Sequence, residues 1–467
     1  MDFCAPLSKK LDQSPPFSGS FSQGTFTKTP FNMKQSLMVG TAVKKAALVL
    51  ALILTVSFLS YILAEKQFVF TASGQYSELV ISIRNDGSVD PSTAPLQWNG
   101  NAYTLTSDVD CNTIIIQRDN LVFDGANHTI ELLGSISITQ RENVTVKNTI
   151  IKAGLGISLS GSNNKIIGNT FHINATNAIA VSHTGFAVTT GNIISNNTIE
   201  LKNGFAGVDV FKASDTVISD NTILTAESSS QVFGGITVSS SHNTSVVGNN
   251  INAYTTYGIA ILGNYLDSSL EGEVLSAVVR ANHVTGNYSF GVYSNCPNVD
   301  ITGNKVTGDL KRNPESYGIM LREDSDNNVV SQNYVLNNGV GICFQPFLNN
   351  AVEGILKSKV FENSLVNNNI QAEINMANCS ISWDNGGKGN YWSNYNGTDS
   401  NDDGIGDIPY IIGGAYKDNY PLMKPVVIPT QIPEPSAESL PATTILAASA
   451  VVAIIGIGLF ACFKKRY

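Results

Sequence analysis

A short string recurs through the middle of the chain: an asparagine, then any residue, then an apolar one. Successive copies begin 21 to 33 residues apart, at Asn148, Asn169, Asn197, Asn221, Asn249, Asn282, Asn304 and Asn333. A second string, a glycine (once an alanine) followed by an apolar residue, begins 8 to 14 residues later, at Gly156, Ala178, Gly207, Gly235, Gly258, Gly291, Gly318 and Gly341. Repeats built on one plan predict a solenoid.

The strings adjoin short segments in which apolar and polar residues alternate, as in residues 156–159 (Gly-Ile-Ser-Leu). Such segments have the period of a β-strand, and stacking equivalent strands of successive repeats buries a continuous core. The consensus of leucine-rich repeats is missing, and a propeller needs roughly 40 residues or more per blade. We therefore predict an all-β, right-handed parallel β-helix over residues 96–380, with roughly 11 coils about 4.8 Å apart.

The repeated asparagines and glycines are expected to serve this scaffold. Asparagine tolerates the left-handed backbone region, and stacked Asn side chains can hydrogen-bond along a ladder. The glycines are expected to supply tight corners. Neither column is predicted to be catalytic.

Charge and hydropathy constrain where the protein works. The net charge is −9 and no basic patch occurs in the central region, which argues against a nucleic-acid partner. Residues 46–64 and 442–463 are apolar, uncharged and flanked by basic residues, as bilayer-spanning helices are. We predict that 442–463 is a membrane helix, with a buried core helix as the alternative. Residues 46–64 are expected to be a signal peptide or an uncleaved transmembrane helix.

These segments set the predicted domain order and place the β-helix at the cell surface. The parts are a cytoplasmic or unfolded tail (1–45), the first apolar segment (46–64), a linker or N-terminal cap (65–95), the β-helix (96–380), a C-terminal cap (381–424), a Pro-rich linker (425–441), the second apolar segment (442–463) and a basic cytoplasmic tail (464–467).

Both ends of the predicted solenoid resemble a known family. Residues 103–106 (Tyr-Thr-Leu-Thr) and 114–130 are similar to the first coils of the NosD-type right-handed parallel β-helix, and residues 389–423 resemble the closing segment of the same group. The resemblance covers about residues 96–424 and implies a place among carbohydrate-binding and sugar-hydrolase β-helices. The two apolar segments give a layout similar to that of archaeal surface proteins.

The NosD resemblance also implies copper delivery to a periplasmic reductase. Copper prefers Cys, Met and His ligands, but the five His residues are dispersed and no Met-rich or Cys-x-x-Cys cluster occurs. Copper is therefore not expected as a cofactor, and copper handling is kept as an alternative function.

An acidic loop in the predicted cap has the spacing of a calcium site. Asp399, Asn401, Asp403 and Asp407 stand at positions 1, 3, 5 and 9 of a loop with glycine at position 6. The bidentate glutamate expected at position 12 is replaced by Tyr410. We predict a shortened Ca²⁺ loop that stiffens the cap, with a plain acidic turn as the alternative.

The same cap is dense in aromatic residues, namely Trp383, Tyr391, Trp392, Tyr395 and Tyr410. We expect them to plug the open end of the core. The alternative is that exposed rings stack on sugars.

The outward side of the glycine-led strands is the candidate ligand site. Counting two residues from each glycine or alanine gives the outward column Ser158, Ala180, Asp209, Thr237, Ala260, Tyr293, Met320 and Cys343. Two residues further on, Asn295, Arg322 and Gln345 form a polar row beside Tyr293, which suits an extended glycan; a solvated face is the alternative. Hydrolysis needs two carboxylates about 5–9.5 Å apart, and Asp209 has no carboxylate partner one coil away in this register.

An external location bears on two further kinds of residue. Cys111, Cys296, Cys343 and Cys379 are expected to be buried free thiols, although an oxidising exterior permits disulfides. Asn-x-Ser/Thr sequons, at Asn127, Asn143, Asn174, Asn196, Asn243, Asn287, Asn378 and Asn396, are candidate glycosylation sites. Chance occurrence in a chain rich in Asn, Ser and Thr is the alternative.

The sequence thus predicts a membrane-anchored surface protein that binds carbohydrate or another surface polymer without catalysis. A polysaccharide lyase or hydrolase is the first alternative, because inserted loops could supply a second carboxylate. Copper handling of the NosD kind is the second.

Overall fold

The computed structural model describes residues 78–183, 188–227, 232–263, 275–322, 325–346, 356–376 and 379–427. The chain divides into two compact units, and all of these residues belong to the unit Gln75–Tyr467. The predicted apolar segments 46–64 and 442–463 lie outside the described residues, as do the two tails and most of the Pro-rich linker. Within the described ranges, no helix is long and apolar enough to cross a bilayer.

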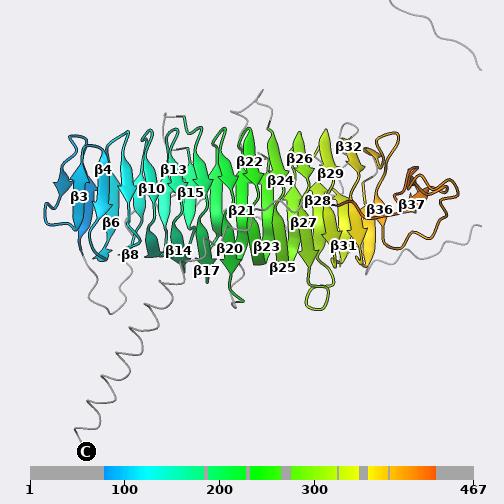
Figure 1. Ribbon diagram of the computed structural model, residues 1–467, viewed down its shortest axis with the longest axis horizontal. Helices are drawn as coiled ribbons and strands as arrows, with labels where there is room; N and C mark the ends of the chain where they lie inside the picture. The colour runs from blue at the N-terminus through cyan, green and yellow to red at the C-terminus, as the bar shows by residue number, and fades with distance from the viewer. Residues whose placement is uncertain are drawn as a thin grey trace, which may run out of the picture. The chain divides into compact units, whose positions relative to one another are not determined.

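Two long sheets of short stacked strands, with a small two-stranded sheet, make up the described residues (Figure 1). The described residues form strands and no α-helix, which confirms the all-β prediction. The 13-stranded sheet contains β3 (Leu96–Asn99), β4 (Ala102–Leu105), β7 (Val122–Asp124), β10 (Thr145–Lys147), β13 (Lys165–Ile167), β16 (Ile193–Ser195), β19 (Val217–Ser219), β22 (Thr244–Val247), β24 (Ala277–Arg280), β26 (Val299–Thr302), β29 (Asn328–Ser331), β32 (Leu356–Phe361) and β35 (Cys379–Ser382).

The 23-stranded sheet supplies a first and a second strand to each successive coil. The first strands are β5 (Val109–Cys111), β8 (Thr129–Leu132), β11 (Ile150–Ala153), β14 (Thr170–Ile173), β17 (Thr198–Leu201), β20 (Thr222–Thr225), β27 (Lys305–Gly308), β30 (Tyr334–Leu336), β33 (Ser364–Val366) and β36 (Tyr391–Trp392). The second strands are β6 (Thr113–Ile116), β9 (Ile136–Ile138), β12 (Ile157–Leu159), β15 (Ile179–Ser182), β18 (Ala206–Phe211), β21 (Val232–Ser239), β28 (Tyr317–Arg322), β31 (Val340–Gln345) and β34 (Ile370–Ile374). In two coils one long strand, β23 (Asn250–Leu262) or β25 (His283–Ser294), serves both positions.

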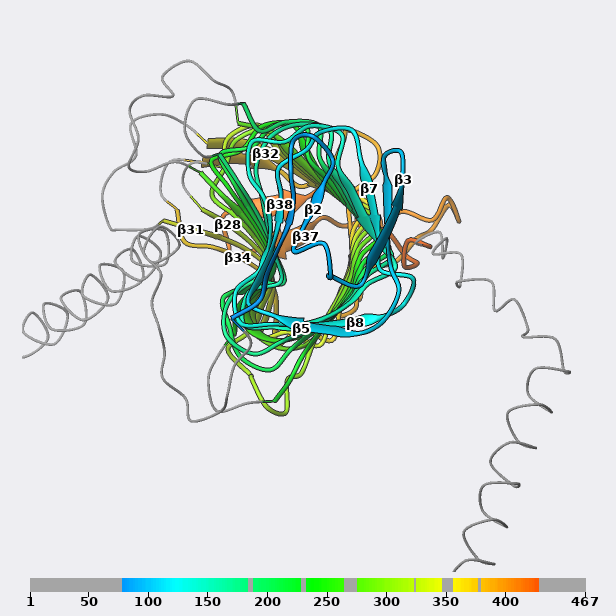
Figure 2. The ribbon, with the colours of Figure 1, turned by 90° about the vertical axis from the view of Figure 1, so that its left-hand side faces the viewer.

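Equivalent strands of neighbouring coils pair in parallel, and the view along the stack shows the coils superimposed around a common core (Figure 2). Antiparallel pairing occurs near the ends. At the N-terminal end β1 (Val80–Ile83) pairs with β2 (Val89–Asp90), and β3 pairs with β4. At the C-terminal end β37 (Tyr410–Ile412) and β38 (Tyr416–Asp418) form a hairpin. A parallel solenoid is therefore the architecture of the described residues.

Alternate side chains of each strand point inward and stack on the same side chain of the next coil. Ile151, Phe171 and Ile199 form one such column and are each fully buried. Burying one such side chain contributes roughly 1.5–3 kcal/mol. The period-2 pattern of the sequence therefore becomes one continuous core.

A ladder of buried asparagine side chains runs beside the first strands. Its members are Asn169, Asn197, Asn221, Asn249, Asn282, Asn304, Asn333, Asn363 and Asn390. Each of the first eight donates from Nδ2 to Oδ1 of the next member at 2.9–3.1 Å. Each backbone N–H donates to the same oxygen, as Asn221 does to Asn249 at 3.0 Å. The ladder is therefore directional, and the acceptor after Asn390 is the Asp418 carboxylate.

The ladder corrects the predicted alignment at its start. Asn148 does not belong to it, because pairing of β11 with β14 aligns Thr149 with Asn169, and the Thr149 N–H donates to Asn169 Oδ1 at 3.1 Å. Asn148 instead has the left-handed backbone, with φ of 51°. The same conformation occurs just before other ladder members, at Asn196 and Asp220. In each of these coils, therefore, one residue has the left-handed backbone and the next residue forms the ladder hydrogen bonds.

The glycine column is in the predicted register, but its physical reason differs from the prediction. Gly258 and Gly291 do not have positive φ, so they are not left-handed corners. A Cβ on Gly258 would lie 2.4 Å from Val284 Cγ1 and 2.5 Å from the Gly291 carbonyl oxygen. Glycine is needed because successive coils approach closely where the first strand meets the second.

Two tryptophans close the C-terminal end of the core. Trp383 and Trp392 are each 1% exposed, with ring centres 5.7 Å apart. Trp392 also stacks on Tyr410 at 4.2 Å. The expected plug is confirmed for these residues, whereas Tyr391 and Tyr395 remain partly exposed at its surface.

Candidate functional site

The second strands carry the outward column that the sequence predicts. Backbone pairing aligns Ser137, Ser158, Ala180, Asp209, Thr237, Ala260, Tyr293, Met320, Cys343 and Glu373. The column changes character along its length. Ser137, Ser158 and Ala180 are small and partly exposed, whereas Thr237 and Ala260 are fully buried. Asp209 lies at this boundary.

Asp209 is held by side chains from both neighbouring coils. Its Oδ1 accepts a 2.5 Å hydrogen bond from Thr237 Oγ1, and its Oδ2 accepts a 3.5 Å bond from Asn177 Nδ2. Loss of water around the carboxyl raises its pKa to about 6, against the opposing effect of the Thr237 hydrogen bond. The group therefore changes charge in the mildly acidic range. With Ala180 and Thr237 beside it, it has no carboxylate partner on either adjacent strand.

Two phenylalanines flank Asp209 on the same coil. Phe211 projects from the same side of β18 and is 37% exposed. Phe205 precedes β18, and its ring stacks on Phe233 with centres 4.6 Å apart. Towards the preceding coil, the Phe205 N–H donates to the Thr176 carbonyl, and the ring has no second ring partner among the described residues. One coil thus presents a carboxylate between two aromatic groups.

Phe205 begins a row of aromatic rings that the sequence analysis did not identify. The row continues through a second stack, in which Tyr257 and Phe290 are 5.2 Å apart and Phe290 and Tyr317 are 5.5 Å apart. Phe233 meets Tyr257 edge-on, at 61°, because the strand register places Gly234 opposite Tyr257. The available signal was an aromatic residue one or two positions before successive column glycines.

The four predicted ligand residues lie on neighbouring coils but are largely covered. They are Tyr293, Asn295, Arg322 and Gln345. Tyr293 and Asn295 are each only 5% exposed. Asn295 Oδ1 accepts the Gly263 N–H at 2.7 Å, and an Arg322 guanidinium N–H donates to the Pro346 carbonyl at 2.7 Å. The polar row therefore makes internal bonds, and its role in ligand binding stays a prediction.

Tyr293 belongs to a second hydrophobic cluster outside the main core. The cluster consists of Tyr293, Met320, Val340 and Cys343, with Tyr257, Leu262, Phe290 and Tyr317 packed against it. The Tyr293 ring is edge-on to both Tyr257 and Phe290. Apolar side chains thus close the outward side of β23, β25, β28 and β31, whereas the outward side of β9, β12 and β15 carries small, partly exposed residues.

The acidic loop is closed by hydrogen bonds of its own. The Asp399 carboxylate accepts the N–H groups of Asp403 and Gly404 at 3.2 and 2.9 Å. Asp407 instead accepts from Ser400 Oγ at 2.7 Å, and hydrogen bonds from this serine lower its pKa. Among the described residues, no group of three or more His, Cys, Asp or Glu side chains could hold a metal ion. Calcium binding by Asp399, Asn401, Asp403 and Asp407 stays a prediction.

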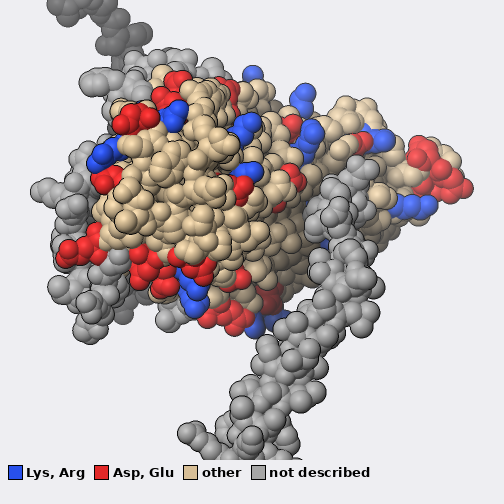
Figure 3. Space-filling view, turned by 60° about the vertical axis from the view of Figure 1, so that its left-hand side comes forward, with Lys and Arg blue, Asp and Glu red and all other residues tan. Residues whose placement is uncertain are grey.

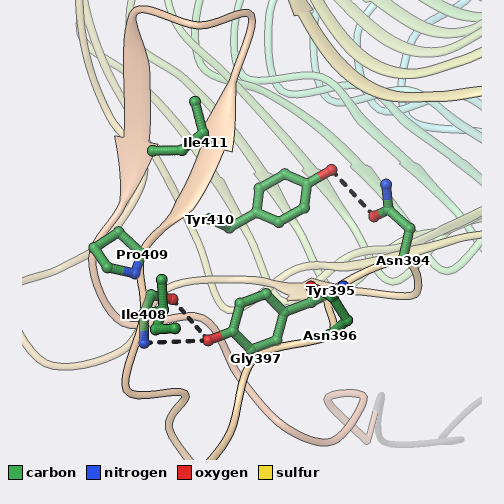
Figure 4. A pocket seen from close by; sticks show the side chains of 8 residues that line it. All are labelled: Asn394, Tyr395, Asn396, Gly397, Ile408, Pro409, Tyr410 and Ile411. Carbon is green, nitrogen blue, oxygen red and sulfur yellow. Dashed lines mark hydrogen bonds between the residues drawn. The ribbon is translucent and has the colours of Figure 1, made fainter.

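A cavity of about 220 Å³ opens beside this loop in the cap (Figure 4). Two tyrosines line it in fixed positions. Tyr395 OH donates to the Ile408 carbonyl at 2.6 Å, and Tyr410 OH donates to Asn394 Oδ1 at 3.1 Å. Ile408 and Ile411, also in its lining, are 60% and 58% exposed. The cap therefore presents a rigid aromatic and apolar depression.

The four cysteines among the described residues are free, as expected. Cys111, Cys296 and Cys343 are buried and Cys379 is partly buried. Burial raises the pKa of Cys111 to about 12, so its thiol stays protonated at neutral pH.

The sequons mostly fall on coil corners at the surface. Asn127, Asn143, Asn174, Asn196, Asn243 and Asn396 are exposed, and Asn287 is partly exposed. Asn378 lies outside the described residues. Glycosylation at these positions stays a prediction.

One face of the β-helix has a broad area without charged side chains (Figure 3). On the face seen in Figure 3, the Lys, Arg, Asp and Glu side chains gather at the margins around a broad uncharged area. A phosphate backbone needs clustered positive charge, which this face does not offer.

Comparison with known families matches two overlapping parts of the chain. Residues 134–306 match the right-handed β-helix region, and residues 263–397 match the family described as periplasmic copper-binding protein (NosD). Residues 134–397 are thus similar to right-handed β-helix repeats, and the later part of that range is similar to those of the NosD family. This result agrees with the resemblance that the two ends of the solenoid suggested. No curated protein shows significant sequence similarity to this chain.

Solved β-helix structures are similar at low sequence identity. The periplasmic alginate epimerase AlgG has a TM-score of 0.40 and 13% identity, covering 65% of this chain and 84% of its own. A mutant tailspike protein of E. coli bacteriophage HK620, in complex with a pentasaccharide, has a TM-score of 0.36 and 13% identity over 61% and 64% of the two chains. The mannuronan C-5 epimerase AlgE6 A-module of Azotobacter vinelandii has a TM-score of 0.31 and 14% identity over 58% and 90%. These likenesses are too distant to assign an activity to this chain.

Proposed function

We propose that this protein binds carbohydrate outside the cytoplasm without catalysing a reaction. The observation that carries the proposal is the group Phe205, Asp209 and Phe211 on one coil of the β-helix. A sugar ring combines apolar C–H surfaces with hydroxyl groups. Aromatic rings suit the former, and a carboxylate that accepts hydrogen bonds suits the latter. Binding sites of this kind combine apolar lining with few, well-placed polar groups.

The site is also held rigid, which favours binding because little order has to be imposed on the protein. Phe205 is fixed by its stack on Phe233, and Asp209 is fixed by Thr237 and Asn177. All of these side chains project from the coils around β18, whose backbone is paired on both sides.

A glycan array probed with the full chain tests the proposal. We expect Phe205→Ala and Asp209→Asn to lower the apparent affinity for bound glycans at least tenfold. Ile370→Ala is the matched control, because this side chain is also outward and 47% exposed but lies on β34, far along the stack. Absence of any glycan binding, or full binding by both site variants, would contradict the proposal.

Catalysis at Asp209 is the first alternative. A carboxyl with a pKa of about 6 suits a general base, but glycoside hydrolysis needs a second carboxylate within about 5–9.5 Å. Neither adjacent strand supplies one at this position. Bond cleavage in neutral or uronate polymers, lost in Asp209→Asn, would favour the enzyme over the binding protein.

Copper handling is the second alternative, and the NosD match over residues 263–397 favours it. Within that range Met320 and Cys343 place two sulfur atoms on adjacent strands. Both are almost fully buried, and burial raises the pKa of Cys343, which disfavours the thiolate that binds metal. We therefore place copper handling below carbohydrate binding.

Anchoring at the cell surface completes the proposal. It is supported by the composition of residues 46–64 and 442–463 and by the basic residues beside them. A membrane-impermeant amine reagent applied to intact cells should label lysines of the β-helix, such as the exposed Lys152 and Lys202. Labelling only after lysis would exclude the surface location.

A further inference from the structure

The site around Asp209 is open on one side along the stack. Preceding coils contribute Ser137, Ser158 and Ala180 to the outward column, all small and partly exposed. Coils lie about 4.8 Å apart, so these three positions form a floor roughly 14 Å long that leads up to Asp209. Thr139 and Ser182, two residues further along their strands, add hydroxyl groups and no charge.

The site is closed on the other side. Beyond Asp209 the column continues with Thr237 and Ala260, both 0% exposed, and then with Tyr293 at 5%. The Tyr293 ring is edge-on to the Tyr257 ring. Tyr257 belongs to the aromatic row and Tyr293 to the second hydrophobic cluster, and together these side chains cover the following strands. A ligand lying along the outward column can therefore extend from Asp209 towards β9 but not towards β25.

We infer that the site binds a linear, neutral saccharide by one of its two ends, with the terminal sugar over Asp209 and beside Phe211 and the rest of the chain lying over β15, β12 and β9. This inference rests on the proposed carbohydrate binding and adds which part of a glycan is recognised. The floor positions carry hydroxyl or methyl groups and no charged side chain, which suits a neutral chain, and the Asp209 carboxylate repels a uronate above its pKa. One cation, Lys212 Nζ, lies 5.5 Å from the centre of the Phe211 ring, at the end of the site rather than on the floor.

The closed end gives the recognition its specificity. A sugar in the middle of a polymer continues on both sides, and one side would run over Thr237 and Ala260, which other parts of the protein already cover completely. Such a polymer is rejected by steric clash rather than by a missing contact. A chain end has nothing beyond its last residue and fits.

Calorimetric titration of the full chain tests the inference, with maltohexaose, cellohexaose, mannohexaose and N-acetylchitohexaose as probes. The hexaose that binds is then compared with two capped forms, one labelled at the reducing end with 2-aminobenzamide and one blocked at the non-reducing end by a 4,6-O-benzylidene group. We expect one cap to lower affinity at least tenfold and the other to be tolerated. For maltohexaose, its cyclic counterpart, which has no ends, should not bind.

A substitution in the floor supplies the second arm. Ser158→Trp fills the open side two coils before Asp209 and should lower hexaose affinity at least tenfold. Ser245→Trp is the matched control, since this serine is also outward and partly exposed but lies on β22 in the other sheet. Circular dichroism confirms that both variants fold.

The outcomes separate the two claims. If the glycan array shows binding but none of these neutral hexaoses binds, the inference fails while carbohydrate binding stands; if the array shows no binding either, both fail. If a hexaose binds and both capped forms bind equally well, end recognition is wrong while carbohydrate binding stands. Unchanged affinity in Ser158→Trp would likewise remove the inferred path of the chain.

Discussion

Asn390 donates its backbone N–H to Asp418 Oδ2 at 2.6 Å, and this bond ends the asparagine ladder. The same carboxylate accepts the Trp392 indole N–H at 2.9 Å and the Tyr420 N–H at 3.0 Å. Burial raises the pKa of Asp418, and these hydrogen bonds oppose the rise. Each asparagine inside the ladder accepts hydrogen bonds from the member before it and donates hydrogen bonds to the member after it. The last acceptor of the ladder has no further coil to which it could donate a hydrogen bond. A carboxylate fits that place because, when ionised, it only accepts.

We predict that Asp418→Ala strongly destabilises the protein. The change leaves the buried N–H groups of Asn390 and Trp392 without an acceptor, at a cost of about 1–3 kcal/mol for each unsatisfied group. Chemical denaturation followed by tryptophan fluorescence measures the shift in midpoint. Lys417→Ala is the control, because this neighbour is exposed. Equal midpoints for the two variants would show that the ladder does not need its terminal acceptor.

Asp209 should make stability depend on pH. Its pKa of about 6 lies above the ordinary value of 3.8, so the folded protein binds this proton more tightly than the unfolded chain does. The resulting stability is complete below about pH 4 and is lost as the pH rises through 6. Asp209→Asn should therefore be more stable than the wild type at pH 8, by roughly 3 kcal/mol, and equally stable at pH 4. Thermal unfolding at the two pH values checks this, and a variant less stable at pH 8 would contradict it.

Carbohydrate binding should follow the same titration. Hydrogen bonds to an ionised carboxylate are stronger than those to a neutral carboxyl group. We expect wild-type affinity to fall as the pH drops through about 6, and the residual affinity of Asp209→Asn to stay constant. Titration calorimetry between pH 5 and 8 measures both. A pH-independent wild type would show that Asp209 does not contact the ligand.

The glycine column gives a packing prediction. Gly258→Ala introduces a Cβ that overlaps Val284 and the Gly291 carbonyl, and overpacking of this kind costs about 1–3 kcal/mol. Gly387→Ala is the control, because a Cβ there meets nothing closer than 3.9 Å and the backbone is not left-handed. Denaturation midpoints should separate the two variants, and a neutral Gly258→Ala would mean that the coils can move apart without loss.

Metal removal tests the acidic loop. If Asp399, Asn401 and Asp403 take up Ca²⁺, the ion replaces the hydrogen bonds that now close the loop and holds the cap more firmly. We expect EDTA to lower the melting temperature of the full chain and excess Ca²⁺ to restore it. A melting temperature unaffected by either treatment would leave a plain acidic turn.

The sequence predicted the solenoid because its determinants are local and repeated. The glycine column fell in the observed register without any correction, since each glycine sits beside an alternating strand. The alignment failed at Asn148, where an Asn-Thr-Ile string matches the motif but is shifted by one residue. The motif alone does not tell which of Asn148 and Thr149 occupies the ladder position. The residue at the start of the ladder needs only a backbone N–H that donates to Asn169, and every residue except proline has one.

The candidate site was harder to predict because burial is not a local property. Tyr293 lies outside the main core, as predicted, yet side chains of neighbouring coils cover it, and Asn295 is only 5% exposed. The position of the Phe205 ring is set by its stack on Phe233, which is 28 residues away in the chain. Asp209 was recognised as a lone carboxylate, but the flanking rings and the raised pKa depend on packing that no spacing rule conveys.

The direction of the asparagine ladder also bears on how such a chain can change its length. Every asparagine of the ladder donates the same two N–H groups to the next member and accepts the same two from the member before it, so any member can follow any other. Deleting residues 221–248 would bring Asn197 against Asn249 with the bonding unchanged. Only the start at Thr149 and the end at Asp418 are unique. Gene rearrangement can therefore lengthen or shorten the rod by whole repeats, and the distance between a bound ligand and either terminus is adjustable without redesign of the fold.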